Sequence, residues 1–394
     1  MNKIFKVIWS KSKQCYVVVS EVAKNNTGKK KIVVASILAG LAMLISGGVS
    51  NVVAVAPIAP VDRPSQGLAN GSVKPGTTNG VAIASSSYID SHQSIAIGYR
   101  SYASGTFLGG NIKPSIAIGA GADARGNNTI SIGTVANNAA SYAVALGNES
   151  NVESGADYGL AVGYGSSVST QQGIAIGTNT KATASLAMAI GNGAKASGEN
   201  AISVGRGTSA SGGDAVSIGT SAQATGSDSL ALGKNAMANN GDSIAVGQDT
   251  VANKINSVAL GHSAQATGAS ANALGAQSKA SGVAAIAIGL NTNTSSDYSA
   301  TIGYNSKATV NESVALGSDS EATVAAGVSG YNPNTGRTST YSSLSGIALT
   351  STKGAVSIGS STNTRQITGL AAGTKDTDAV NVAQLKSVNL AVTG

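Results

Sequence analysis

A short pattern of apolar, small and glycine residues recurs along most of the chain. The copy from Ser243 to Ala252 reads SIAVGQDTVA, with a small residue between two aliphatics, then a glycine, then mainly small and polar positions. From Gly163 to Gly317 the glycine returns at every fourteenth position, and Gly359 lies three further periods on. A fixed period of this kind indicates a repeat architecture in which each copy is one structural unit.

Each copy predicts two short β-strands. The aliphatic residues lie two positions apart, as Ile244 and Val246 do, and this spacing places both side chains on one face of a strand. The glycine permits a bend, and small residues three and five positions later, such as Ala264 and Ala266, predict a second strand. One period therefore forms one coil, and stacked coils predict an all-β, parallel β-roll solenoid.

The pattern also leads to an expectation about the inside of the roll. We expect the aliphatic pairs of one wall to meet the alanines of the other wall in a thin core. The small residue between the aliphatics would then point outward and let the backbone of another chain approach. A thin core favours such self-association, because one coil buries little apolar surface. The resulting candidates for contacts between chains are Ala96, Ala117, Ala245 and Ala259.

Two positions of the repeat carry polar side chains of interest. Asn272 stands where nearly every other copy has an aliphatic residue, so we expect either a buried, hydrogen-bonded amide or a locally distorted strand. The column four residues after each glycine is expected on the outer face of the second strand. It is interpreted as a solvated face or, alternatively, as a ligand-binding stripe whose lysines are Lys181, Lys195, Lys279 and Lys307.

The segment 1–56 predicts an unusually long secretory signal. A charged cluster at 29–31 precedes an apolar run at 32–45, and small residues then offer cleavage after Ala54 or Ala56. The apolar run is shorter than the roughly 20 residues that a membrane-spanning helix needs.

The positive net charge belongs to this signal. The chain has 25 Lys and Arg against 18 Asp and Glu, and the segment 1–56 holds eight of the former and one of the latter. The segment 57–394 thus carries 17 of each and is neutral, which excludes the nucleic-acid interface that a pI near 9.3 would suggest. Cys15, the only cysteine, also lies in the signal, so disulfide and thiol chemistry are not expected in the mature chain.

Composition divides the remaining chain into segments. The stretch 57–80 holds four of the six prolines and is expected to form a flexible leader. The repeats occupy 81–325, with an insertion in 99–118, and 326–364 contains a second insertion before the pattern returns. The pattern assigns no role to either insertion.

Motifs that would suggest catalysis lack the required context. Three copies match G-x-G-x-x-A, as 191–196 does, but a dinucleotide site needs a helix after the strand. His92 and His262 lie far apart in the stack, and the sequence pattern supplies neither a catalytic triad nor a metal-ligand set around them. We therefore expect neither enzyme activity nor a cofactor nor a bound metal.

The C-terminal pattern predicts a short helix. Asp378 is a candidate N-cap, and Val382, Leu385, Asn389 and Val392 fit alternating a and d positions of a coiled coil.

Taken together, these segments resemble the trimeric autotransporter adhesins of the YadA-like type. The repeats resemble the head repeats of that family, the segment 1–56 resembles its extended signal, and 365–386 resembles its neck almost residue for residue. The neck residues that we single out are Arg365, Gln366, Asp376 and Asp378.

The resemblance implies a homotrimer of left-handed parallel β-rolls, whose neck leads into a coiled-coil stalk that starts at 387–394. It implies that Val382 and Leu385 contact other copies, and that the protein is exported to the outer membrane and surface of a Gram-negative bacterium. It also implies adhesion to host matrix or cell-surface proteins, often collagen. The sequence ends at Gly394 without a long stalk or the β-strands of a membrane anchor, so we expect either a fragment or a product that cannot anchor itself.

Two alternatives to an adhesin head remain. One is a structural spacer that holds another domain away from the membrane. The other is a β-solenoid enzyme such as a polysaccharide lyase, which needs broad coils and clustered carboxylates, whereas this coil is short and its acids are scattered. The sequence does not identify a receptor.

Overall fold

The computed structural model describes 5–10, 15–20, 66–68, 71–75, 77, 79–105, 113–332, 337, 338, 347 and 349–393. The expected cleavage sites at Ala54 and Ala56 lie outside these residues. The chain divides into two units, Met1–Val61 and Asp62–Gly394. In the first unit, β1 (Phe5–Ser10) and β2 (Cys15–Ser20) form an antiparallel pair. No helix among the described residues is long and apolar enough to cross a membrane.

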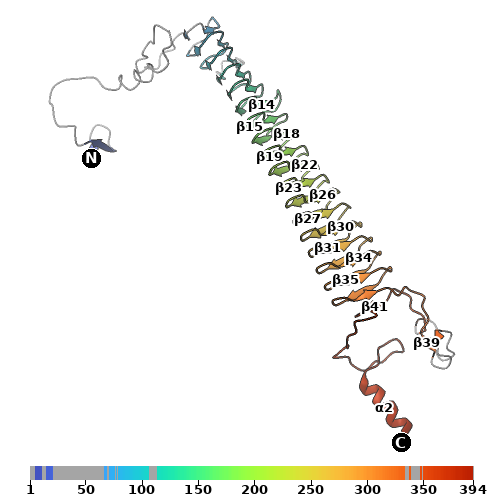
Figure 1. Cartoon of the computed structure of the whole chain (residues 1–394). Helices are drawn as coiled ribbons and strands as arrows, with labels where there is room; N and C mark the ends of the chain where they lie inside the picture. The colour runs from blue at the N-terminus through green and yellow to red at the C-terminus, as the bar shows by residue number, and fades with distance from the viewer. Residues whose placement is uncertain are drawn as a thin grey trace. The chain divides into compact units, whose positions relative to one another are not determined.

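The second unit contains a parallel β-solenoid with a long and a short strand in each coil (Figure 1). In the coil around Gly247, the long strand β27 spans Ile244–Val246 and the short strand β28 spans Val251–Ala252. Ile244 pairs with Val258 of the next coil, and Val251 pairs with Gln265, so both ladders repeat with the period of the sequence. The predicted β-roll is thus confirmed, with 17 coils from β5 to β38.

The long strands form one ladder and the short strands form the other. The long strands are β3 (Gln66–Leu68), β5 (Val81–Ile83), β7 (Ile95–Ile97), β9 (Ser115–Ile118), β11 (Thr129–Ile132), β13 (Val144–Leu146), β15 (Leu160–Val162), β17 (Ile174–Ile176), β19 (Met188–Ile190), β21 (Ile202–Val204), β23 (Val216–Ile218), β25 (Leu230–Leu232), β27, β29 (Val258–Leu260), β31 (Asn272–Leu274), β33 (Ile286–Ile288), β35 (Ala300–Ile302), β37 (Val314–Leu316) and β41 (Val356–Ser357). The short strands are β4 (Ser72–Val73), β6 (Tyr88–Ile89), β8 (Tyr102–Ala103), β10 (Asp123–Ala124), β12 (Asn137–Asn138), β14 (Asn151–Val152), β16 (Ser167–Val168), β18 (Lys181–Ala182), β20 (Lys195–Ala196), β22 (Ser209–Ala210), β24 (Gln223–Ala224), β26 (Met237–Ala238), β28, β30 (Gln265–Ala266), β32 (Lys279–Ala280), β34 (Asn293–Thr294), β36 (Lys307–Ala308) and β38 (Glu321–Ala322).

Small side chains fill the inside of each coil. In the coil of Gly247, Ser243, Ala245, Thr250 and Ala252 are all fully buried. The Thr250 hydroxyl donates to the carbonyl of Gly247 at 2.9 Å, and the Ser243 hydroxyl donates to the carbonyl of Asn240 at 2.6 Å. The hydroxyls are therefore satisfied by the turns beside them, and the core of the roll consists largely of alanine.

The repeat glycine marks the closest approach between successive coils. Gly233 has a φ of +136°, and a Cβ atom built on it would lie 2.4 Å from the carbonyl oxygen of Gly247. That distance is far below van der Waals contact, so no side chain fits. The turn residues Asn235 and Asp242 both have a φ of 54°, a region that Asn and Asp tolerate better than most residues.

The stack begins earlier than composition predicted. β3 pairs with β5 and β4 pairs with β6, and the amide of Ser72 donates to the carbonyl of Ser87 at 2.8 Å. Part of 57–80 is therefore not a flexible leader, because its backbone continues both ladders.

After β38 the chain leaves the stack and returns to it. The short strands β39 (Tyr331–Asn332) and β40 (Arg337–Thr338) form an antiparallel pair within the second insertion. β41 then pairs with β37, and the helix α2 spans Val382–Thr393 near the C-terminus.

Candidate functional site

The outward side of the long strands carries rows of mainly aliphatic side chains. We call this surface the long-strand face; it consists of the residues three and one positions before each repeat glycine. Several of these side chains are between 36 and 48% exposed: Leu146, Leu232, Ile244, Leu260, Ile286, Ile288, Ile302 and Leu316. Monomeric soluble proteins rarely expose an apolar surface as extended as this stack of strands, so this face indicates contact with other chains.

This arrangement reverses the predicted inside and outside of the long strand. Ala96, Ala117, Ala245 and Ala259 are completely buried in their own coils, so the prediction that they contact another chain is wrong. Alternation along a strand fixes only that neighbours point to opposite sides. The thin interior accepts alanine but has no room for two large aliphatics, and the large side chains therefore point outward.

Asn272 belongs to the long-strand face. β31 pairs in regular register with its neighbours, Asn272 lying beside Val258 and Ile286, and the side chain is partly exposed. The strand is therefore not distorted and the amide is not buried within the chain, so neither alternative predicted for Asn272 is correct.

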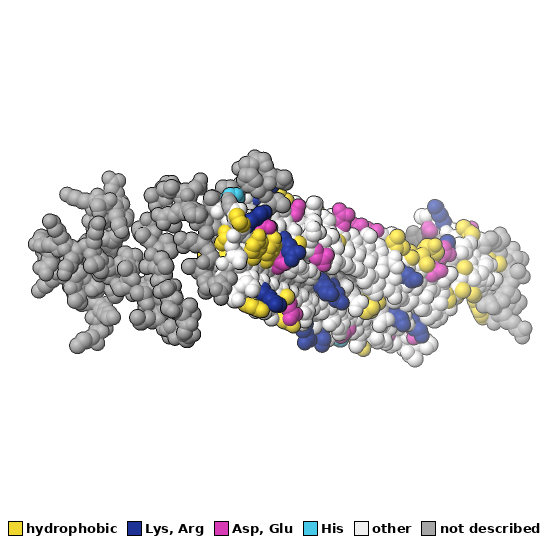
Figure 2. Space-filling model, turned by 90° about the horizontal axis from the view of Figure 1, so that it is seen from above, with side chains coloured by type: hydrophobic (Ala, Val, Ile, Leu, Met, Phe, Trp, Pro, Cys, Tyr) yellow, Lys and Arg dark blue, Asp and Glu magenta, His cyan; other side chains and the backbone are white. Residues whose placement is uncertain are grey.

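The lysine column lies on the outward side of the short strands. Lys181, Lys195, Lys279 and Lys307 are all exposed, and Lys181 is directly beside Lys195 in the ladder. None of the four forms an ion pair within the described part of the chain. Figure 2 shows charges of both signs dispersed over the face in view, without a large patch of one sign. The column has the geometry of a solvated face, and its role in ligand binding stays a prediction.

An aromatic cluster that the sequence did not suggest lies on the first short strands. The rings of Tyr88 and Tyr102 stack with centroids 5.6 Å apart. The Tyr102 hydroxyl donates to Asp90 at 3.1 Å, and Arg125 lies over the Tyr102 ring and pairs with Asp123 at 2.6 Å. Burial, together with the carboxylate of Asp90, raises the pKa of Tyr102. The polar groups of this cluster therefore find partners within the chain, and their contacts join neighbouring coils.

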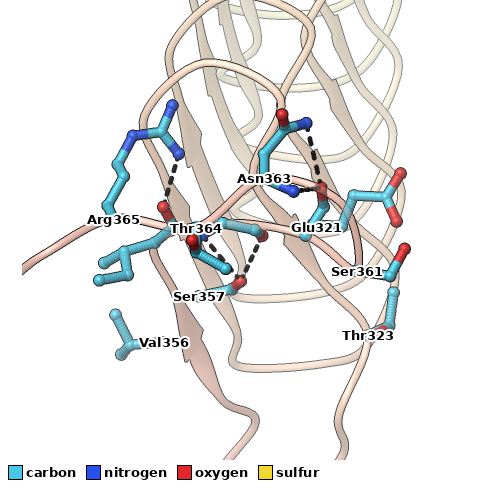
Figure 3. A pocket seen from close by; sticks show the side chains of 11 residues that line it. Glu321, Thr323, Val356, Ser357, Ser361, Asn363, Thr364 and Arg365 are labelled. Carbon is cyan, nitrogen blue, oxygen red and sulfur yellow. Dashed lines mark hydrogen bonds between the residues drawn. The ribbon is translucent and has the colours of Figure 1, made fainter.

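Arg365 attaches the predicted neck to the last coils. Its guanidinium donates to the Ile358 carbonyl at 2.6 Å, to the Ser320 hydroxyl at 3.1 Å and to the Ser318 carbonyl. Arg365 also lines a shallow pocket between β38 and the segment that follows β41, where Asn363 hydrogen-bonds to Ser360 (Figure 3). The guanidinium of Arg365 and the side chain of Asn363 are both held by these bonds, so we interpret the pocket as a structural joint.

The start of α2 differs from the prediction. Asp378 is not the N-cap, because it lies before the helix and accepts hydrogen bonds from the amides of Thr374 at 2.9 Å and Lys375 at 3.0 Å. These backbone bonds, Thr374 first, hold the pKa of Asp378 below its usual range. The cap is Asn381, which accepts from the Gln384 amide at 3.0 Å while Gln384 accepts from the Asn381 amide at 3.2 Å. The N-x-x-Q spacing was the sequence signal for this capping box.

The other neck candidates lie on the surface. Gln366 and Asp376 are exposed. Val382 and Leu385 are 67 and 65% exposed, so the single chain leaves both apolar side chains uncovered at the start of α2.

Comparison with known protein families shows which family combines these features. The model of the YadA head domain repeat matches just over half of the chain, at 91–107, 113–136, 154–180, 182–208, 210–236, 238–264, 266–292 and 295–320. The chain belongs to the YadA-like trimeric autotransporter adhesins. The extended signal peptide of the type V secretion system matches residues 1–49, and the coiled stalk of trimeric autotransporter adhesins matches 366–394.

Membership of this family settles the class and the location of the protein. The family consists of surface adhesins and not of enzymes, as the sequence predicted. The signal match indicates export by a type V pathway to the surface of a Gram-negative bacterium. The three matched models follow the chain order that the sequence predicted, namely signal, head repeats and stalk.

Comparisons with individual proteins align only part of this chain. The autotransporter adhesin BadA of Bartonella henselae is 51% identical over 65 residues, which are 16% of this chain and 2% of BadA. The chain therefore spans only a small part of this curated relative. The crystal structure of the collagen-binding domain of the Yersinia adhesin YadA is 27% identical, with a TM-score of 0.26, and the match covers 57% of this chain and 86% of that domain.

Proposed function

We propose that this chain is the head of a homotrimeric adhesin that binds host matrix or cell-surface proteins. The long-strand face supports the homotrimer, because it presents two large outward residues in nearly every coil and none of them is fully covered within the chain. The exposed Val382 and Leu385 would continue the same contact into α2. The short-strand side then remains outermost and available to a host ligand.

Binding along this head is proposed to be distributed over many coils. The segment 57–394 is neutral overall, and the outer surface of the repeats is built from short polar columns, so each coil would contribute weak contacts. Three chains and many coils multiply such contacts, and avidity would set the strength. A matrix protein with its own repetitive structure, such as collagen, fits this arrangement.

Surface plasmon resonance on the exported protein tests the proposal. Immobilised collagen, fibronectin and laminin would be compared for wild type and for heads that lack 178–191 or 178–205, which are one and two whole periods. We expect binding that falls gradually with each deletion, and a head with Lys181→Glu and Lys195→Glu as a local control that changes binding little. Binding that disappears with a single coil would instead indicate a localised site.

A structural spacer is the second candidate, and the uniformity of the coils favours it. A trimer that binds none of these proteins, and whose display on cells changes no adhesion to host surfaces, would support the spacer and overturn the adhesive role.

A further inference from the structure

The long-strand face is so regular that apolar burial alone does not align neighbouring copies. The coils share one period, and the residue three before the glycine is Val, Ile, Leu or Met in almost every coil. If one copy moved along another by one coil, about 4.8 Å, nearly every apolar contact would be replaced by an equivalent one. Some other feature must therefore select one register among several of similar apolar area.

Asn272 interrupts this regularity. The column is the set of residues three positions before each repeat glycine. In this column Asn272 pairs directly with Val258 of the previous coil and Ile286 of the next. Its Nδ2 group donates to the carbonyl of Ser270 at 3.3 Å, and within the described residues its Oδ1 atom accepts no hydrogen bond. The amide therefore retains an acceptor and a second N–H, and its side chain belongs to the face that the proposed homotrimer would cover.

A second irregularity lies nearby. Ala300, two coils after Asn272, is the small member of the same column. The coil with the polar Asn272 and the coil with the small Ala300 thus distinguish this part of the long-strand face from the more uniform coils before it.

We propose that Asn272 sets the register of the assembled copies, an inference that rests on the proposed homotrimer. When three copies are aligned, their Asn272 side chains lie at one level, where each amide can donate to the next and accept from the previous one. When one copy is displaced by a coil, its amide faces Val258 or Ile286 and loses these partners in a site closed to water. A buried amide without a partner is unfavourable, so the aligned arrangement is selected. A single polar position fixes the register of coiled coils by the same principle.

The experiment measures alignment far from the neck, since α2 could align the C-terminal end independently. Chains with Gln223→Cys carry one type of spin label, and chains with Gln265→Cys, three coils further along, carry another; both sites are exposed on the short-strand side, and all chains have Cys15→Ser. After the two kinds of chain are assembled together, pulsed EPR between the two label types measures a distance with a component along the stack, which changes when one copy slips by a coil. We expect one narrow distance for the wild-type face. Asn272→Val should keep the mass of three copies in light scattering and broaden the distances into several populations. Ile286→Val, an apolar exchange in the next coil, should leave the distance narrow.

Moving the amide gives a second test. The pair Val258→Asn and Asn272→Val shifts the polar level by one coil, so these chains should form narrow trimers among themselves. When they are refolded with wild-type chains, mixed trimers should be at least tenfold rarer than random assortment gives. A narrow distance for Asn272→Val, or free mixing, would overturn the role of Asn272 while leaving the homotrimer intact. A wild-type mass of one copy would overturn the homotrimer, and with it this inference. If Asn272→Val does not assemble, Asn272→Ala takes its place in the same measurements.

Discussion

Three glycines of this head should respond to alanine in very different ways, although all lie in turns of the same roll. Gly233 combines a φ of +136° with a Cβ position only 2.4 Å from the Gly247 carbonyl oxygen. Gly193 also has a positive φ, +68°, but a Cβ there meets nothing within 4 Å. Gly213 has neither the unusual φ nor a close neighbour. Comparing alanine substitutions at these three glycines therefore distinguishes the cost of backbone strain from the cost of steric conflict between coils.

The expected magnitudes follow from these differences. Gly193→Ala carries only the left-handed conformation, which costs about 1–2 kcal/mol. Gly233→Ala adds a conflict with backbone atoms that requires the two coils to separate, which weakens the bond from the Gly247 amide to the Leu232 carbonyl at 2.8 Å. Strain of about 1–3 kcal/mol and a lost hydrogen bond of about 1 kcal/mol give roughly 3 kcal/mol in total. Gly213→Ala should be neutral or stabilise by about 0.4–1 kcal/mol.

Hydrogen exchange is the suitable assay, because long repeat arrays do not unfold in one cooperative step. Amides of β25 and β27 should exchange about a hundredfold faster in Gly233→Ala, since about 1.4 kcal/mol corresponds to a factor of ten. The same measurement on Gly193→Ala should show a rise of about tenfold around its own coil, and Gly213→Ala should show none. Equal exchange in Gly233→Ala and Gly213→Ala would refute the close approach of successive coils on which the fold is argued.

The remaining predictions concern the core and the neck. Ala245→Leu should destabilise its coil by about 1–3 kcal/mol, because the fully buried site has no room for three more carbons; unchanged hydrogen exchange of the β27 amides would contradict this. Asp378 has a folded pKa below the unfolded value of about 3.9, so its contribution is present above that pH and is lost as the pH falls through the lowered pKa. Far-UV CD of α2 during acidification should show this loss in wild type and not in Asp378→Asn, and identical titrations would count against it. Gln384→Ala removes half of the capping box and should cost about 0.5–2 kcal/mol of helix stability, seen as faster exchange at the start of α2, whereas Gln366→Ala should have no effect.

Much of the fold could be predicted because the repeat leaves few alternatives. A glycine at every fourteenth position and an aliphatic pair two positions apart determine the coil length, the parallel pairing and the positions of both strands, as β27 and β28 show. The stalk match at 366–394 agrees with the family resemblance of the C-terminal segment, and the neck at 365–386 stays a prediction. The order of signal, head and stalk followed from the same patterns.

The orientation of the long strand could not be predicted in the same way. Alternation shows that Ile244 and Ala245 point to opposite sides, but hydrophobicity alone placed the larger side chain inside. The deciding quantity is the narrow separation between the walls, which depends on three-dimensional packing. For Asp378, a good N-cap residue type was present three positions too early, and the reciprocal pair of Asn381 and Gln384 determines where the helix begins. The contacts of Arg365 with Ser318 and Ser320 join parts of the chain that are distant in sequence, and no local pattern reveals them.

The most direct test of the account is the mass of the assembled head after charges are placed on the long-strand face. Ile244→Glu together with Val258→Glu puts two carboxylates on adjacent strands of that face, while Lys279→Glu puts one on the short-strand side as a control. Light scattering should give the mass of three copies for wild type and for Lys279→Glu, and a smaller mass for the double variant. A double variant that keeps the mass of three copies would show that the chains meet elsewhere and would contradict the account.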